Sequence, residues 1–256
     1  MKAEELAKQW GDKYIATYDE YKALLGQLKE TGKLMSFKKA LHSDSFIVLR
    51  HDVEYSLDKA ARMAVIEYEA GVKSTYFVQI ESPAYNALSP DNYQRIQIIL
   101  RTGHKVGLHY RQQLTLNRRK NEYAIAKQME VLGNAIGQQV SLFSVHIPDG
   151  GTDYQNYKIP GAVNAYAQPF FRRFGEPGDD VLYISDSELH WNYALPTAEV
   201  FEANKRIQLL VHPYGWDDRQ RTPAEIFTEM AEEKAKDLIA CFRTDYRPYG
   251  AMEGKA

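Results

Sequence analysis

Short apolar runs alternate with amphipathic stretches along most of the chain. The apolar runs are rich in β-branched and aromatic residues and end at Gly, Pro or charged residues, a pattern typical of buried strands. The predicted strands are 46–54, 74–80, 105–110, 140–146, 181–186 and 206–213. Apolar positions at helical spacing, followed in several cases by glycine, predict helices in the intervening stretches. The predicted helices are 3–10, 18–32, 57–70, 90–103, 121–137 and 223–242.

This alternation of strand and helix predicts parallel strands joined by helical crossovers. We expect an α/β fold, with a distorted or incomplete parallel β/α barrel as the first choice and an open doubly wound sheet as the second. The pattern breaks between 147 and 180, where Pro, Gly, Asn and Asp are frequent. No linker divides the chain, so we predict one domain over 1–256, with 1–44 as an N-terminal helical extension.

Charge and cysteine content narrow the classes of function. The formal net charge is −2, and the only short basic run is 118–120, so a nucleic-acid interface is not expected. Cys241 is the only cysteine, which excludes an internal disulfide, and its apolar surroundings predict a buried side chain. The first residues lack the apolar run of a signal peptide, and no stretch is long and apolar enough to span a membrane. We therefore expect a cytoplasmic protein.

Ionisable residues follow the apolar part of five predicted strands. In parallel β/α folds, the carboxyl ends of the strands meet at one mouth, where ligands bind. Independent structural accidents would not place such residues at the same end of each strand, so we interpret them as one site. These residues are His51, Asp52, His109, His146, Asp186 and His212.

The mixture of imidazole and carboxylate groups predicts a divalent metal ion, with Zn²⁺ as the first choice. Such an ion lowers the pKa of a water that it binds and polarises a carbonyl oxygen. A base and a proton donor would complete a hydrolytic site. One constraint applies to His51 and Asp52, because neighbours in a regular strand point to opposite faces. Both can serve one site only if the strand ends or bends there.

Several motifs, in this order, resemble those of polysaccharide deacetylases. "LRHDVE", a helix, "STYFV" and then "GHKVGLHY" resemble the opening of these carbohydrate esterases. "FSVHIPDG", "YISDS" with Trp191, and "LLVHP" resemble later motifs of a divergent branch associated with surface polysaccharide biosynthesis. The resemblance covers about 46–216. It implies a deformed β/α barrel and removal of an acyl group from an amino sugar.

Carried over by position, the resemblance assigns roles to single residues. Asp52 and His109 would be metal ligands, and His212 would be the general acid. His51 stands where the family has its aspartate base, and an imidazole can act as a base near neutral pH. Gln113 stands where the family has a second metal-binding histidine, and its amide is a poor ligand for Zn²⁺.

We expect His146, from the next strand, to supply the missing third ligand. Asp186 would orient a histidine or contact substrate, since carboxylates often fix the tautomer of a metal-site histidine. A further group of residues is predicted to bind the sugar or a phosphate attached to it: Arg50, Tyr110, Arg111 and Trp191.

The leading hypothesis is therefore hydrolysis of the amide of an acylated amino sugar. A cytoplasmic location favours a nucleotide-linked or lipid-linked precursor over a mature polymer. Two alternatives remain open. The first is a sugar-binding or accessory protein that keeps the fold without the chemistry. The second is a related C–N hydrolase, such as a deformylase acting on a modified sugar, because fold alone does not fix function.

Overall fold

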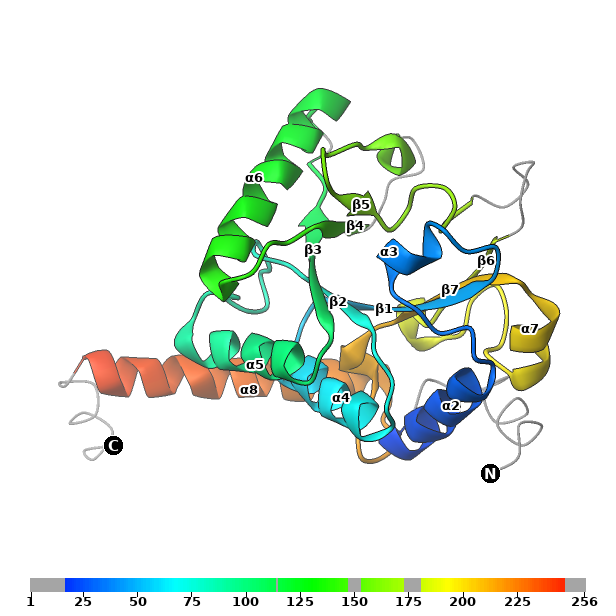
Figure 1. Cartoon of the computed structure of the whole chain (residues 1–256). Helices are drawn as coiled ribbons and strands as arrows, with labels where there is room; N and C mark the ends of the chain where they lie inside the picture. Colours follow the sequence, from blue (N-terminus) through cyan, green and yellow to red (C-terminus); the bar gives the residue numbers. More distant parts are fainter. Residues whose placement is uncertain (1–16, 114, 147–152, 173–180, 247–256) are drawn as a thin grey trace. The chain divides into compact units, whose positions relative to one another are not determined.

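The computed structural model describes residues 17–113, 115–146, 153–172 and 181–246, in two compact units (Figure 1). The larger unit is Met1–Gln220, and the smaller is Arg221–Ala256. The smaller unit contains α8 (Pro223–Asp245). The single domain over 1–256 stays a prediction. Cys241 on α8 is exposed, so its predicted burial is wrong. Among the described helices, none has the length and apolar character needed to cross a membrane.

A seven-stranded parallel sheet forms the centre of the larger unit. Its strands are β1 (Phe46–Val53), β2 (Thr75–Val78), β3 (Lys105–Arg111), β4 (Leu142–His146), β5 (Val163–Asn164), β6 (Val181–Ser185) and β7 (Arg206–Val211). Their order across the sheet is β5-β4-β3-β2-β1-β7-β6. The short strand β5 lies in the region between 147 and 180 for which no strand is predicted from the sequence.

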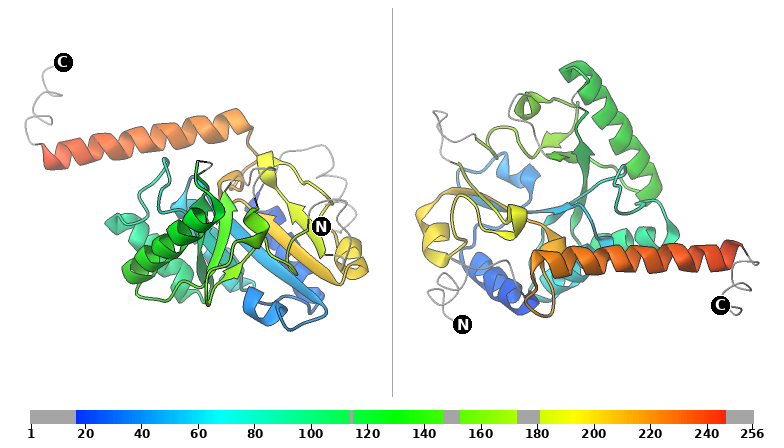
Figure 2. Two further views of the ribbon diagram at one scale, coloured as in Figure 1. Left: turned by 90° about the horizontal axis from the view of Figure 1, so that it is seen from above. Right: turned by 180° about the vertical axis from the view of Figure 1, so that it is seen from behind.

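The strand order distinguishes a barrel from an open doubly wound sheet. From β1 to β5 each strand pairs with the next one in sequence, and β6 then pairs with β7, which returns to β1. The strands thus follow one direction around a ring, with the opening between β5 and β6. A doubly wound sheet instead reverses its direction at a switch point. The prediction of an incomplete parallel β/α barrel is confirmed, and the curl of the sheet is visible in Figure 2.

The long helices of the larger unit lie close to their predicted positions. The α-helices among the described residues of this unit are α2 (Tyr18–Glu30), α3 (Phe37–Ala40), α4 (Leu57–Glu69), α5 (Pro90–Arg101), α6 (Arg118–Ile136) and α7 (Ala198–Ala203). The Ser56 side chain caps α4 by accepting a hydrogen bond from the Lys59 amide, as its position predicts. Gly71 follows this helix with a φ of 71°, a backbone conformation that favours glycine. The predicted helix at 3–10 lies outside the described residues.

The two faces of the sheet have different surroundings. On β1, the side chains of Ile47 and Leu49 belong to the apolar core that includes residues of α2 and α4. The alternate residues Phe46 and Val48 instead pack with Phe77 and other aromatic rings on the opposite, inner face. All residues of β1 are buried, as expected for a parallel strand that is covered on both sides. The same alternation decides which polar residues near the end of β1 reach the inner face.

Room on the inner face is limited beside Gly107 of β3. A Cβ atom at this position would lie 2.6 Å from two ring atoms of Phe77 and 2.9 Å from the carbonyl oxygen of Leu142. Phe77 and Gly107 are direct register partners of β2 and β3. A backbone carbonyl cannot move away cheaply, so only glycine lets the Phe77 ring occupy this space.

The outer face of β1 holds a buried polar cluster centred on Glu67 of α4. The Glu67 carboxylate is surrounded by five polar side chains, those of Tyr21, His51, Ser74, Tyr76 and His104. His51 Nε2 lies 2.5 Å from Glu67 Oε1, and the His51 ring stacks on Tyr76 with 4.3 Å between centroids. Burial alone would raise the pKa of Glu67, but the adjacent histidines and the Ser74 hydroxyl lower it. His51 is therefore a structural partner of Glu67.

Replacing Gly107 with alanine is expected to lower the free energy of unfolding by about 1–3 kcal/mol, because the added methyl group overpacks the inner face. Gly26 in α2 is a matched control, since a Cβ there meets nothing within 4 Å. Gly26→Ala should stabilise the protein by up to about 1 kcal/mol through helix propensity. Urea unfolding monitored by circular dichroism measures both changes. Equal stability of the two variants would contradict the close packing at Gly107.

The Glu67→Gln variant should lose about 3–5 kcal/mol of stability, because it leaves buried histidines without their carboxylate partner. The exposed Glu69 lies on the same helix, and Glu69→Gln should change stability by less than about 0.5 kcal/mol. Chemical denaturation at neutral pH compares the two. A loss in the Glu67 variant no larger than that of the control would show that the cluster contributes little to folding.

Candidate active site

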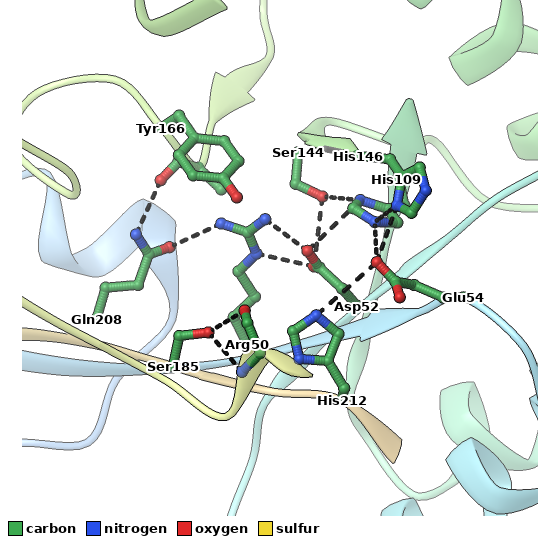
Figure 3. A network of polar contacts seen from close by, with 12 residues as sticks. Arg50, Asp52, Glu54, His109, Ser144, His146, Tyr166, Ser185, Gln208 and His212 are labelled. Carbon is green, nitrogen blue, oxygen red and sulfur yellow. Dashed lines mark hydrogen bonds and ion pairs between the residues drawn. The ribbon is translucent and has the colours of Figure 1, made fainter. Parts of the chain in front are cut away.

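Three strand ends bring one carboxylate and two imidazoles together on the inner face. Glu54 directly follows β1, His109 lies on β3, and His146 ends β4. His146 Nδ1 lies 2.8 Å from Glu54 Oε1 and 3.2 Å from His109 Nε2, while His109 Nε2 lies 3.5 Å from Glu54 Oε1. We call these three residues the donor cluster (Figure 3). Among the described residues, this is the group of histidines and carboxylates arranged so that it could hold a metal ion.

The protonation of the donor cluster suits a cation. Burial lowers the pKa of His109, which favours the neutral imidazole that binds metals. Burial alone would raise the pKa of Glu54, but the adjacent His109, His146 and His212 lower it, so this carboxylate is ionised at neutral pH. One carboxylate oxygen and two imidazole nitrogens form a donor set that suits a catalytic divalent ion with open positions. The residues therefore fit the metal that the sequence predicts.

Asp52 lies beside the donor cluster and is held by Arg50. The guanidinium donates two hydrogen bonds to the two Asp52 oxygens, at 2.8 and 2.7 Å. Burial alone would raise the pKa of Asp52, but the Arg50 charge and its hydrogen bonds, together with His109, lower it. Both oxygens of Asp52 are thus engaged, and Asp52 Oδ2 faces His109 Nδ1 at 3.6 Å. Glu54, rather than the predicted Asp52, completes the donor cluster.

Arg50, which is predicted to contact substrate, is fully buried. Its guanidinium stacks over the Tyr166 ring at 4.3 Å and donates a long hydrogen bond of 3.5 Å to Gln208 on β7. Gln208 in turn donates to the carbonyl oxygens of Ala165 and Phe170. These contacts fix the guanidinium from several sides. Arg50 therefore positions Asp52 and has no surface left for a sugar.

His212 faces the donor cluster from the end of β7. Its Nε2 lies 3.8 Å from Glu54 Oε1, and its Nδ1 lies 2.6 Å from Asp186 Oδ1. Asp186 also accepts hydrogen bonds from the His212 amide and from Nε1 of Trp216. Burial alone would lower the pKa of His212, but the Asp186 carboxylate and Glu54 raise it to about 9. His212 is therefore protonated at neutral pH, and Asp186 orients it, which is one of the roles predicted for this aspartate.

The remaining predicted residues lie in different surroundings. His51, predicted as the base, is on the outer face with Glu67, away from the donor cluster. Tyr110, predicted to bind substrate, also points outward, where its hydroxyl donates to Asn121 at 2.7 Å. Arg111 is exposed at the end of β3, and Trp191 is half-buried near Trp216. For these two, substrate binding stays a prediction.

Glu54 is the functional residue that sequence reasoning missed. It stands two positions after Asp52, so both side chains project from β1 toward the same face. The spacing of Arg50, Asp52 and Glu54 thus contains the signal, since alternate residues of a strand share one face. The predicted strand includes residue 54, but the resemblance assigns roles only to the adjacent pair His51 and Asp52 on this strand.

Solved structures with a similar fold include carbohydrate esterases and deacetylases. One is the Xyl-CE4 domain of a multidomain xylanase from the hindgut metagenome of Trinervitermes trinervoides, with 19% identity, 77% of this chain and 83% of that chain covered, and a TM-score of 0.42. Another is the chitin deacetylase of the fungal pathogen Colletotrichum lindemuthianum, with 16% identity, 73% and 81% covered, and a TM-score of 0.43.

A third structure is a mutant of BA3943, a CE4 family pseudoenzyme, with 15% identity, 75% of this chain and 64% of that chain covered, and a TM-score of 0.44. No family profile and no curated protein sequence matches the chain.

Proposed function

We propose that this protein is a metal-dependent hydrolase that removes the acyl group from the amide of an acylated amino sugar. The observation that supports the proposal most directly is that metal-binding, proton-accepting and proton-donating side chains lie together at one end of the barrel. A three-residue donor cluster lies beside an ionised carboxylate, Asp52, and faces a protonated imidazole, His212. Hydrolysis of an amide needs these functions: a site for a Lewis acid, a proton acceptor and a proton donor.

Glu54, His109 and His146 would hold the divalent ion. When bound, such an ion lowers the pKa of water and stabilises negative charge on a carbonyl oxygen. The ligand set leaves positions open for substrate, since the protein contributes three donors. Zn²⁺ is our first choice because it is commonly bound by two imidazole nitrogens together with one carboxylate oxygen.

His212 would protonate the departing nitrogen. An amine leaves an amide readily only when it receives a proton, so the donor must be charged at working pH. The Asp186 carboxylate supplies this condition by raising the pKa of His212 to about 9 and by fixing the ring through Nδ1. The opposite nitrogen, Nε2, is then the atom that carries the proton toward the site.

Asp52 would accept the proton from the attacking water. It is ionised, lies on the inner face of β1 beside His109, and is fixed in orientation by both hydrogen bonds from Arg50. Asp52 thus takes the role that the sequence assigns to His51. The acceptor and the donor stand on different strands, β1 and β7, which are paired neighbours in the sheet.

The substrate class rests on the sequence motifs together with this chemistry. A nucleotide-linked or lipid-linked amino sugar in the cytoplasm is our proposal for the natural substrate, as a precursor of a surface polysaccharide. Arg111, exposed at the end of β3, is the candidate contact for a phosphate on such a precursor. Trp191 is the candidate contact for the sugar ring.

Metal binding is the direct test, measured by elemental mass spectrometry and by Co²⁺ titration of the purified protein. The wild type should bind about one divalent ion per chain, and His109→Ala and Glu54→Gln should lose it. His42→Gln is the control, because His42 is exposed and lies outside the donor cluster, so metal binding should be unchanged. Absence of metal in the wild type after reconstitution would favour the non-catalytic, sugar-binding alternative.

Loss of activity without loss of metal should identify the acid and the base. Asp52→Asn and His212→Asn are expected to retain the ion but to lower kcat on an acylated amino sugar by about 10²–10⁴-fold, the usual contribution of such groups. Hydrolysis is followed by release of the acyl acid, alongside the metal content of each variant. A fully active Asp52→Asn enzyme would contradict the role of Asp52 as proton acceptor.

A further inference from the structure

Ser144 contacts both a metal-ligand candidate and the proposed base. It lies on β4, is fully buried, and is the direct register partner of His109 on β3. Ser144 Oγ lies 2.7 Å from His109 Nδ1, and the hydroxyl donates a hydrogen bond of 3.4 Å to Asp52 Oδ1 (Figure 3). One hydroxyl therefore joins β1, β3 and β4 beneath the donor cluster.

The neighbouring charges decide which way this hydroxyl points. Arg50 donates to both oxygens of Asp52, so Asp52 acts as the acceptor and the single Ser144 proton is directed toward it. The hydroxyl oxygen then accepts from His109 Nδ1–H. Asp52 Oδ2, 3.6 Å from the same nitrogen, also favours a proton on Nδ1. On the other side of the ring, Nε2 lies 3.5 Å from Glu54 Oε1 and 3.2 Å from His146 Nδ1, both longer than the 2.7 Å contact of Nδ1 with Ser144. The shorter contact therefore keeps the proton on Nδ1 and the lone pair on Nε2.

We infer that Ser144 is a positioning residue that fixes the tautomer and ring orientation of His109 for binding a divalent cation, and that holds Asp52 beside it. The inference rests on the proposed function, since it concerns the same site. A neutral histidine with its proton on Nε2 cannot bind a metal through that atom. Removing a side chain that orients a metal-binding histidine in this way commonly lowers the affinity of the site for the metal.

The Ser144 side chain is enclosed within the inner face of the sheet. Leu142 and His146 flank Ser144 on the inner face, and Arg50 reaches Asp52 from below. Ser144 has no exposed surface, so its hydroxyl is not available to substrate. Its effect must pass through His109 and Asp52, which distinguishes it from a catalytic residue.

Co²⁺ titration, followed by visible absorption, tests the inference on the whole protein. Ser144→Ala should weaken Co²⁺ binding by about 10–100-fold, and Ser144→Thr, which keeps the hydroxyl, should recover most of the affinity. Ser185→Ala is the matched control, because Ser185 is equally buried on β6 and bonds to Ser187 instead of the donor cluster. Thermal unfolding of each variant verifies that the protein is folded.

A second readout follows the tautomer itself without metal. In the metal-free wild type, the ¹⁵N chemical shifts of His109 should report a proton on Nδ1, and Ser144→Ala should shift the population toward Nε2–H. Equal Co²⁺ affinity and unchanged His109 shifts in Ser144→Ala would overturn the inference while leaving the proposed function intact. Failure of the wild type to bind Co²⁺ would instead contradict both.

Discussion

The alternation of side chains along β1 is the constraint on which the site depends. The strand is buried on both faces, so every polar side chain that it carries must find a partner within the protein. Arg50, Asp52 and Glu54 face inward, where the first two pair and the third meets the histidines of β3 and β4. His51 faces outward and pairs with Glu67. A shift of one residue along this strand would exchange the two sets and dismantle both clusters.

The inner face can be followed as successive levels from the amino to the carboxyl ends of the strands. Phe46 and Val48 pack among aromatic rings at the first level. Arg50 lies at the second level and fixes the orientation of Asp52 by donating two hydrogen bonds to its carboxylate. Glu54 stands at the mouth. The aromatic base thus supports the ion pair, and the ion pair in turn supports the groups proposed to react.

Every described strand except the two-residue β5, together with the long helices, could be predicted because apolar periodicity and glycine stops are local signals. The barrel followed from their alternation. Convergence of His109, His146 and His212 was also predictable, since parallel strands end at one mouth. The assignment of His51 and the omission of Glu54 arose because resemblance transferred adjacent positions, whereas strand geometry selects alternate ones. The contact of His51 with Glu67 of α4 on the outer face could not be predicted, because the sequence of β1 does not show which residue of a distant helix packs against it.

The most direct test of the central claim is a crystal structure of the protein grown with Co²⁺, with anomalous diffraction recorded at the cobalt edge. The account predicts one strong anomalous peak among Glu54 Oε1, His109 Nε2 and His146 Nδ1, with Asp52 bound to Arg50 and not to the ion. A peak coordinated by Asp52 in place of Glu54, or no peak at the barrel mouth, would contradict it.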